Sequence, residues 1–205
     1  MSKSTHFIGQ PLLGQILSFI DHAEVFRISK EYGGERYVKH FDGWHHLVTM
    51  LYAIIMRFDS LREIQASMAA ESRKLSHLGL TKIPRRSTLS DANKRRPEKV
   101  FGAIYAKLYD KYQGVLSSDS RNSSSTPSWL NKLKIMDSTT ISLFSNLIFK
   151  GVGRNPNRGK KKGGLKVHTI INANEGVPCD VQFTSAATHD HFLLCPSKLN
   201  RDDIM

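Results

Sequence analysis

Hydrophobic residues follow two different periods along the chain. Up to about residue 116 they recur three and four positions apart, as in amphipathic helices, and from residue 131 they alternate with polar residues, as in strands. The first period predicts helices over residues 11–30, from near 42, over 60–75, 87–96 and 97–112, and the second predicts strands over 132–144, 165–172 and 177–183. The Asn174-Glu-Gly176 turn is expected to join the last two strands as a hairpin. Between them, residues 117–130 are rich in Ser, Asn and Pro, which is typical of a linker.

The pattern therefore predicts an α+β protein of more than one domain. We expect an all-α domain over residues 1–116, a linker over 117–130 and a strand-rich domain over 131–205. Asp42 and the Ser60–Glu63 capping box suit two helix N-termini. Ser87 or Thr88 is expected to cap the short helix before Pro97.

Positive charge is concentrated in two blocks of the sequence. The chain has a net charge of +12; residues 73–99 hold nine Lys and Arg against two acids, and residues 150–166 hold seven against none, so the remaining residues sum to −2. Such blocks indicate a polyanionic partner, nucleic acid first. Solvated basic faces explain the charge equally well at this stage, and an RNA-binding or structural basic protein is a further alternative.

The first basic block contains a candidate DNA-binding helix. Its spacing resembles the second helix of a helix-turn-helix module, and its polar side chains suit both phosphates and base edges. The alternative is a solvated basic helix. The candidate contacts are Arg85, Arg86, Thr88, Ser90, Asn93, Lys94, Arg95 and Arg96. In the second block a Gly-rich loop and the following strand offer Arg154, Arg158, Lys160, Lys161, Lys162 and Lys166 as phosphate contacts.

A single carboxylate, Asp137, stands in the first predicted strand, before a run of hydroxyl residues. Carboxylate oxygens are ligands for hard cations such as Mg²⁺. From this stretch alone, a side-chain cap on a turn is the favoured interpretation. His189 and His191 flank Asp190, which suggests zinc, but neighbours in sequence rarely hold one ion without further ligands. We therefore expect His189 and Asp190 to organise a turn or contact the DNA backbone.

Cysteine use and apolar runs limit the compartment. Cys179 and Cys195 match no zinc or disulfide framework, which favours a reducing compartment. The N-terminus lacks the apolar core of a signal peptide, and the longest apolar run, Met50–Met56, is too short to span a membrane. We therefore expect a cytoplasmic protein without membrane contact.

Three stretches resemble the insertion-sequence-four family of bacterial DDE transposases. They are Met136-Asp-Ser-Thr-Thr140, Lys162-Gly-Gly-Leu-Lys-Val-His168 and Ala187-Thr-His-Asp190, and residues 87–95 are similar to a stretch of the helical domain in one branch of that family. The likeness extends over roughly residues 3–205. It implies a ribonuclease-H-like α/β domain whose first strand carries Asp137 as the first carboxylate of an Asp-Asp-Glu triad, with His168, His189 and Asp190 as secondary site residues.

The resemblance also implies cofactors and partners. Members use two Mg²⁺ (or Mn²⁺) ions for in-line attack on phosphorus, and they bind double-stranded DNA at terminal inverted repeats and at the target. They act as homodimers or larger assemblies, here in the bacterial cytoplasm at the nucleoid. With the resemblance, the metal-ligand role of Asp137 is favoured over the turn cap.

The sequence departs from the family pattern at its end. The family's second Asp and its Glu lie beyond the hairpin, and neither Asp202 nor Asp203 fits the second position, because Ile204-Met205 matches only the start of the next strand. We therefore expect an incomplete catalytic domain with the first three strands only, in a truncated transposase that binds DNA without cutting it. The alternative is a non-catalytic DNA-binding regulator that competes for the element's ends.

Overall fold

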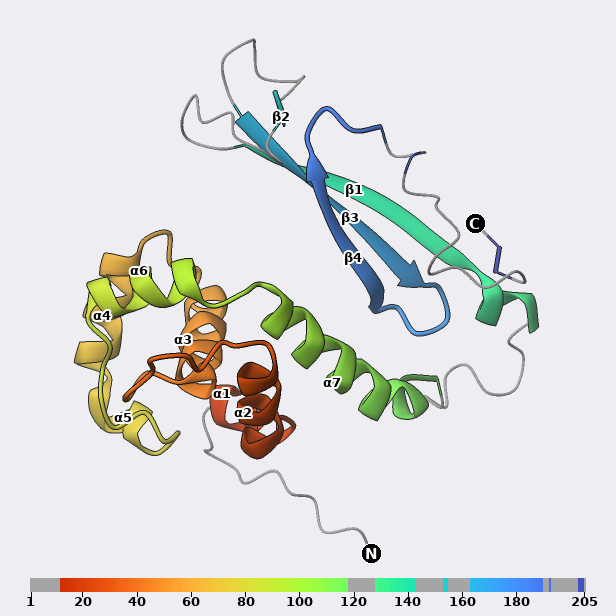
Figure 1. Cartoon of the computed structure of the whole chain (residues 1–205). Coiled ribbons are helices and arrows are strands. Elements are labelled where there is room, and N and C mark those ends of the chain that lie inside the picture. Colours follow the sequence, from red (N-terminus) through yellow and green to blue (C-terminus); the bar gives the residue numbers. More distant parts are fainter. Residues whose placement is uncertain are drawn as a thin grey trace, which may run out of the picture. The chain divides into compact units, whose positions relative to one another are not determined.

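The computed structural model describes residues 12–117, 128–142, 153–154, 163–189, 192 and 203–204. Helices make up its N-terminal part and a sheet follows, so the predicted change from helix to strand is confirmed (Figure 1). The chain divides into two compact units between residues 108 and 109, inside helix α7 (Lys99–Ser117). Residues 118–127 of the predicted linker lie outside the described residues.

Two of the predicted helices are each divided in the structure. The helix expected over residues 11–30 is two helices, because the Asp21 side chain accepts a hydrogen bond from the Ala23 amide (2.9 Å) and begins a new one. The helix expected over residues 60–75 is interrupted at Glu71. The helices of the first unit are α1 (Leu12–Ser18), α2 (His22–Glu31), α3 (Gly43–Ile55), α4 (Leu61–Ala70), α5 (Ser72–Ser76), α6 (Arg86–Arg95) and the first part of α7.

Local capping signals fix two helix starts as predicted. The Asp42 carboxylate accepts from the His45 amide (2.9 Å) at the start of α3. The Ser60 hydroxyl accepts from the Glu63 amide (3.3 Å) at the start of α4, and Glu63 reaches back to the Asp59 amide (3.0 Å). These contacts satisfy amide donors that have no partner within the helix.

The first unit has two neighbouring apolar clusters. One is centred on fully buried residues of α3, α4 and α6, namely Val48, Met68 and Leu89. The other joins α2, α3 and α7 through Val25, Ile28, Leu47, Val100 and Ile104. Ile54 is 68% exposed, because the inward stripe of α3 runs along Val48, Tyr52 and Ala53.

The second unit contains three long antiparallel strands, which lie side by side in Figure 1: β1 (Lys134–Ser142), β3 (Gly163–Asn172) and β4 (Pro178–Ser185). The central strand is β3, with β1 on one side and β4 on the other. The short strand β2 (Gly153–Arg154) pairs with the start of β3, and a 3-10 turn (Ser128–Lys132) precedes β1.

The predicted hairpin between β3 and β4 is present. Gly176 adopts a positive φ of 66°, which favours glycine, and its amide donates to the Asn172 carbonyl (2.9 Å). At the same end, the Tyr109 hydroxyl donates to the Glu175 carboxylate. This contact joins the second part of α7 to the hairpin within the second unit.

Candidate nucleic-acid interface and catalytic strand

Helix α6 packs against other helices of the first unit along one side, and it is also bound to α4 at its start. Leu89 and Ala92, which lie three positions apart, are buried. The predicted cap at Ser87 or Thr88 is wrong, because the helix begins at Arg86 without a side-chain cap of its own. The Gln65 side chain of α4 instead accepts from the Arg86 amide (3.1 Å).

The other side of α6 carries most of the predicted DNA contacts. Arg85, Arg86, Asn93, Lys94 and Arg95 are exposed, and Thr88 and Ser90 are half-buried. The connection from α5 to α6 spans residues 77–85, which is longer than the three- to four-residue turn of a helix-turn-helix motif. The structure therefore offers a basic helix surface, but with a different connection from the one expected.

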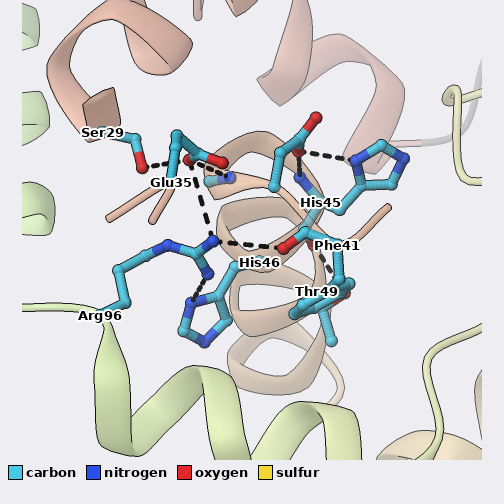
Figure 2. A network of polar contacts seen from close by, with 9 residues as sticks. Ser29, Glu35, Phe41, His45, His46, Thr49 and Arg96 are labelled. Carbon is cyan, nitrogen blue, oxygen red and sulfur yellow. Dashed lines mark hydrogen bonds and ion pairs between the residues drawn. The ribbon is translucent and has the colours of Figure 1, made fainter. Parts of the chain in front are cut away.

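Arg96 does not fit its predicted role as a DNA contact. Its side chain is only 2% exposed, and its guanidinium donates to His46 Nδ1 (2.8 Å) and to the Phe41 carbonyl (3.2 Å) (Figure 2). It also forms an ion pair with Glu35 at 3.8 Å. All of these groups belong to the protein interior, so Arg96 holds the first unit together.

The contacts of His46 determine its tautomer. Arg96 has only donors, so His46 Nδ1 must accept, and Nε2 then carries the proton that it donates to Asn93 Oδ1 (2.7 Å). Burial, together with repulsion from Arg96, lowers the pKa of His46 from its ordinary value to about 4. The ring is therefore neutral at physiological pH, and it links α3 to the last turn of α6 and to the residue that follows this helix.

Glu35 fixes the segment of residues 33–41 that precedes α3. Its carboxylate accepts from the Ser29 hydroxyl and from the Gly43 amide (2.7 Å). Figure 2 shows the contacts of Glu35 with Ser29 and Arg96. Gly34 lies close to the same group: a Cβ there would be 2.7 Å from Ser29 Oγ and 3.1 Å from Arg96 Cγ. The backbone can approach this closely only because residue 34 has no side chain.

A pocket of about 610 Å³ lies between residues 33–41 and α6, and we call it the loop pocket. Its lining is rich in cations and contains no Asp or Glu side chain among the described residues. The polar lining residues are Arg36, Tyr37, Lys39, His40, Thr88, Arg95 and Arg96. Residues 36–40 were not among the predicted site residues. The three basic residues that follow Gly33-Gly34 are the sequence feature that could have indicated them.

Asp137 lies at the middle of β1, on an exposed face of the sheet. Its direct neighbour on β3 is Thr169, which in turn pairs with Val181 on β4. Side chains of paired residues share a face, and this one also carries Ile135, Ile141 and Phe183, all exposed in the described part of the chain. Asp137 is therefore an exposed carboxylate among apolar and hydroxyl neighbours.

The start of β1 has a neighbour on the edge opposite β3. Leu133 and Ile204 form a parallel bridge, in which the Lys134 amide donates to the Ile204 carbonyl (2.7 Å) and the Ile204 amide to the Lys132 carbonyl (2.8 Å). This parallel pairing places residue 204 beside the strand that carries Asp137.

Comparison with known families matches both units of the chain. Residues 8–81 match the family described as domain of unknown function DUF4372, and residues 129–202 match the transposase DDE domain. The second unit therefore contains a transposase DDE domain. Neither a curated protein nor a solved structure matches it.

The DDE transposase family implies divalent metal ions, and the described residues supply only part of what these ions require. Asp137 is an oxygen ligand of the appropriate kind. The described part of the chain brings together no group of three His, Cys, Asp or Glu side chains that could hold a metal ion. The described residues therefore do not form a metal site by themselves.

The remaining predicted site residues have different surroundings. Lys166 Nζ donates to the Thr188 carbonyl (3.0 Å), and His168 is buried with Nε2 2.7 Å from Thr184 Oγ1. His189 is exposed. Several other predicted or considered site residues lie outside the part of the chain that the structure describes. They are the side chains of Arg154, Arg158, Lys160, Lys161 and Lys162, and the residues Asp190 and Asp202.

No helix in the described part of the chain combines the length and the apolar character that crossing a bilayer requires.

Proposed function

We propose that this protein is a DNA transposase of an insertion sequence, close to the insertion-sequence-four family. Its first unit binds the terminal inverted repeats of the element through α6, and its second unit is a ribonuclease-H-like domain in which Asp137 is a metal-binding carboxylate. The match of residues 129–202 to the transposase DDE domain carries this proposal. Double-stranded DNA is the partner, Mg²⁺ or Mn²⁺ the cofactor, a homodimer the active form and the bacterial cytoplasm the compartment.

The arrangement of the strands supports the ribonuclease-H-like fold. Three antiparallel strands in the order β1, β3, β4 form one half of such a sheet, and a parallel neighbour on the free edge of β1 is the next feature that this fold requires. The bridge between Leu133 and Ile204 is a neighbour of this kind. A continuation of this parallel strand would pass beside Asp137, where a second carboxylate would be close enough to share a metal ion.

Helix α6 is the element of the first unit best suited to a duplex. It is fixed by Gln65, Leu89 and the His46–Asn93 hydrogen bond, while its exposed side carries basic and polar groups. A rigid helix with exposed Arg and amide groups can contact both phosphates and base edges.

Substitution of Arg86 tests the role of α6. Arg86→Ala should weaken binding to an inverted-repeat duplex about 5- to 150-fold if it contacts a base edge, equivalent to about 1–3 kcal/mol. If it contacts a phosphate, the slope of log K against log salt should fall by about 0.9. Lys107→Ala on α7 removes an equally exposed cation and is the control. An Arg86→Ala variant with the affinity and salt slope of the Lys107→Ala variant would contradict the assignment.

Substitution of Asp137 separates catalysis from binding. Asp137→Asn should leave folding and duplex affinity unchanged, because the side chain is exposed and the proposal gives it only a metal-binding role. A large loss of either would show that Asp137 is structural.

The non-catalytic regulator remains the second candidate, because the first unit has apolar clusters of its own, separate from the sheet. Incubating the purified 205-residue chain with an inverted-repeat duplex and Mg²⁺ distinguishes the two functions. Cleavage of the duplex would exclude the regulator, and binding without cleavage would favour it for this chain.

A further inference from the structure

The loop pocket has the charge and the size of a nucleotide site. Its volume of about 610 Å³ falls in the range of pockets that enclose small ligands, roughly 300–1,000 Å³. A single phosphate contact on a duplex surface needs no such cavity. Since no acidic side chain among the described residues lines the pocket, no negative charge of the lining repels an anionic ligand.

Two cations of the pocket are available to a ligand. Lys39 and Arg95 are exposed, and neither forms an ion pair or side-chain hydrogen bond within the described residues. They approach the pocket from different elements, Lys39 from the segment before α3 and Arg95 from the last turn of α6. A phosphate between them would be held by two charge-assisted contacts.

Tyr37 supplies a planar apolar surface at the same pocket. It is 81% exposed, and its backbone has a φ of 61°, a conformation that costs a residue other than glycine roughly 1–3 kcal/mol. The Arg36 guanidinium lies 5.1 Å from the centroid of its ring, and Arg36 also donates to the Tyr37 hydroxyl (3.4 Å). A strained, exposed aromatic with a cation beside its ring is typical of a binding site rather than of a packing position.

The contacts of Glu35 fix the pocket before any ligand arrives. The neighbouring backbone is tied back by hydrogen bonds from the Gly34 amide to the Ser29 carbonyl (2.7 Å) and from the Val38 amide to the Glu35 carbonyl (3.2 Å). The Glu35 carboxylate itself interacts with Ser29, Gly43 and Arg96. This leaves Arg36, Tyr37, Lys39 and His40 as the polar side chains of the segment, on a fixed backbone.

We infer that the loop pocket binds one unpaired nucleotide of a DNA strand. Its phosphate lies between Lys39 and Arg95, and its base stacks on Tyr37. Basic grooves with exposed aromatic residues bind single-stranded nucleic acid in this way, because every base has a face that can stack. The inference rests on the proposed DNA-binding function and adds a second contact, made by Tyr37 and Lys39 together with Arg95 at the end of α6.

The test measures the affinity of the full chain for an oligo-dT strand and for an inverted-repeat duplex by fluorescence anisotropy. Stacking on an aromatic residue contributes about 1–3 kcal/mol per base, so Tyr37→Leu should weaken oligo-dT binding about 5- to 150-fold. Tyr37→Phe keeps the ring and should retain the affinity. Both variants should bind the fully paired duplex as the unchanged protein does.

Charge is tested separately at Lys39. Lys39→Gln should lower the salt slope of oligo-dT binding by about 0.7, the value for one phosphate contact on a single strand. Lys107→Gln is the matched control and should leave the slope unchanged. Equal losses for strand and duplex in Tyr37→Leu, or no loss for the strand, would overturn the inference, and so would an unchanged salt slope in Lys39→Gln.

Two further measurements define the ligand and separate this inference from the proposed function. Thymidine monophosphate or inorganic phosphate that displaces oligo-dT at concentrations near the dissociation constant of oligo-dT would assign the pocket to a free ligand and overturn the strand proposal. If Arg86→Ala leaves duplex binding intact while Tyr37→Leu weakens strand binding, the role of α6 fails and the pocket stands. The reverse result would overturn the inference about the loop pocket and leave the proposed role of α6 intact.

Discussion

Replacing Arg96 by Met tests whether its buried charge stabilises the first unit. Met keeps a similar length and an apolar stem but removes the ion pair to Glu35 and the donors to His46 and Phe41. The Arg96 side chain is 2% exposed and that of Glu35 is 11% exposed, so solvent replaces little of what is lost. Breaking such a buried pair typically costs 3–5 kcal/mol.

Glu35 keeps two donors after this change, Ser29 and Gly43, which favours the lower end of that range, about 3 kcal/mol. A domain of this size is stabilised by only about 5–15 kcal/mol in total. With an m-value of about 1–3 kcal/mol/M in urea, the unfolding midpoint should fall by about 1–3 M.

Urea titration with tryptophan fluorescence measures the shift. The chain has two tryptophans, and Trp129→Phe leaves Trp44 of α3 as the reporter of the first unit. Arg95→Met is the matched control: this neighbouring side chain is exposed, so its loss should change stability by no more than about 0.5 kcal/mol. A shift for Arg96→Met as small as that of the control would refute the role assigned to the buried charge.

Two other features of the first unit give measurable predictions. Because the pKa of His46 is lowered to about 4, the unfolded chain takes up its proton first as the pH falls. The contribution of neutral His46 to the free energy of unfolding is therefore complete above pH 6.5 and decreases towards pH 4, by up to about 3 kcal/mol. His46→Gln should flatten the pH dependence of the free energy of urea unfolding over this range. Gly34→Ala should destabilise by about 1–3 kcal/mol, since its Cβ would overlap Ser29. Gly102→Ala, in open space on α7, should stabilise by up to about 1 kcal/mol in thermal unfolding, and a similar gain at Gly34 would contradict the close approach.

The sequence predicted those features that depend on near neighbours. The Asp42 and Ser60 caps and the Asn174–Gly176 turn each involve residues a few positions apart, and all are present. The start of α6 was misjudged because its cap comes from Gln65, which is 21 positions away. The loop pocket was missed for the same reason, since residues 33–41 meet α6 only in the folded chain.

The candidate carboxylate on the sheet depended on a different kind of signal. The alternation around Asp137 predicted the strand, but only the family likeness suggested a role for the carboxylate. Alternation cannot show which face of a strand is covered. In the described residues the face with Ile135, Ile141 and Phe183 is the more exposed one, and His168 and Ile170 are buried on the other.

Arg95 and Arg96 have opposite environments, and the sequence contains the physical reason. Pro97 disfavours the helical conformation in the residue before it, so α6 must end and Arg96 becomes extended, with ψ at 123°. In a continued helix, Arg96 would lie about 100° around the helix axis from Arg95, as the next residue of the same basic segment. Leaving the helix instead brings Arg96 to Glu35 and His46 in the interior, while Arg95, still helical, remains exposed. The same proline therefore divides the basic run into a buried, structural cation and an exposed one that a ligand can reach, which composition alone could not distinguish.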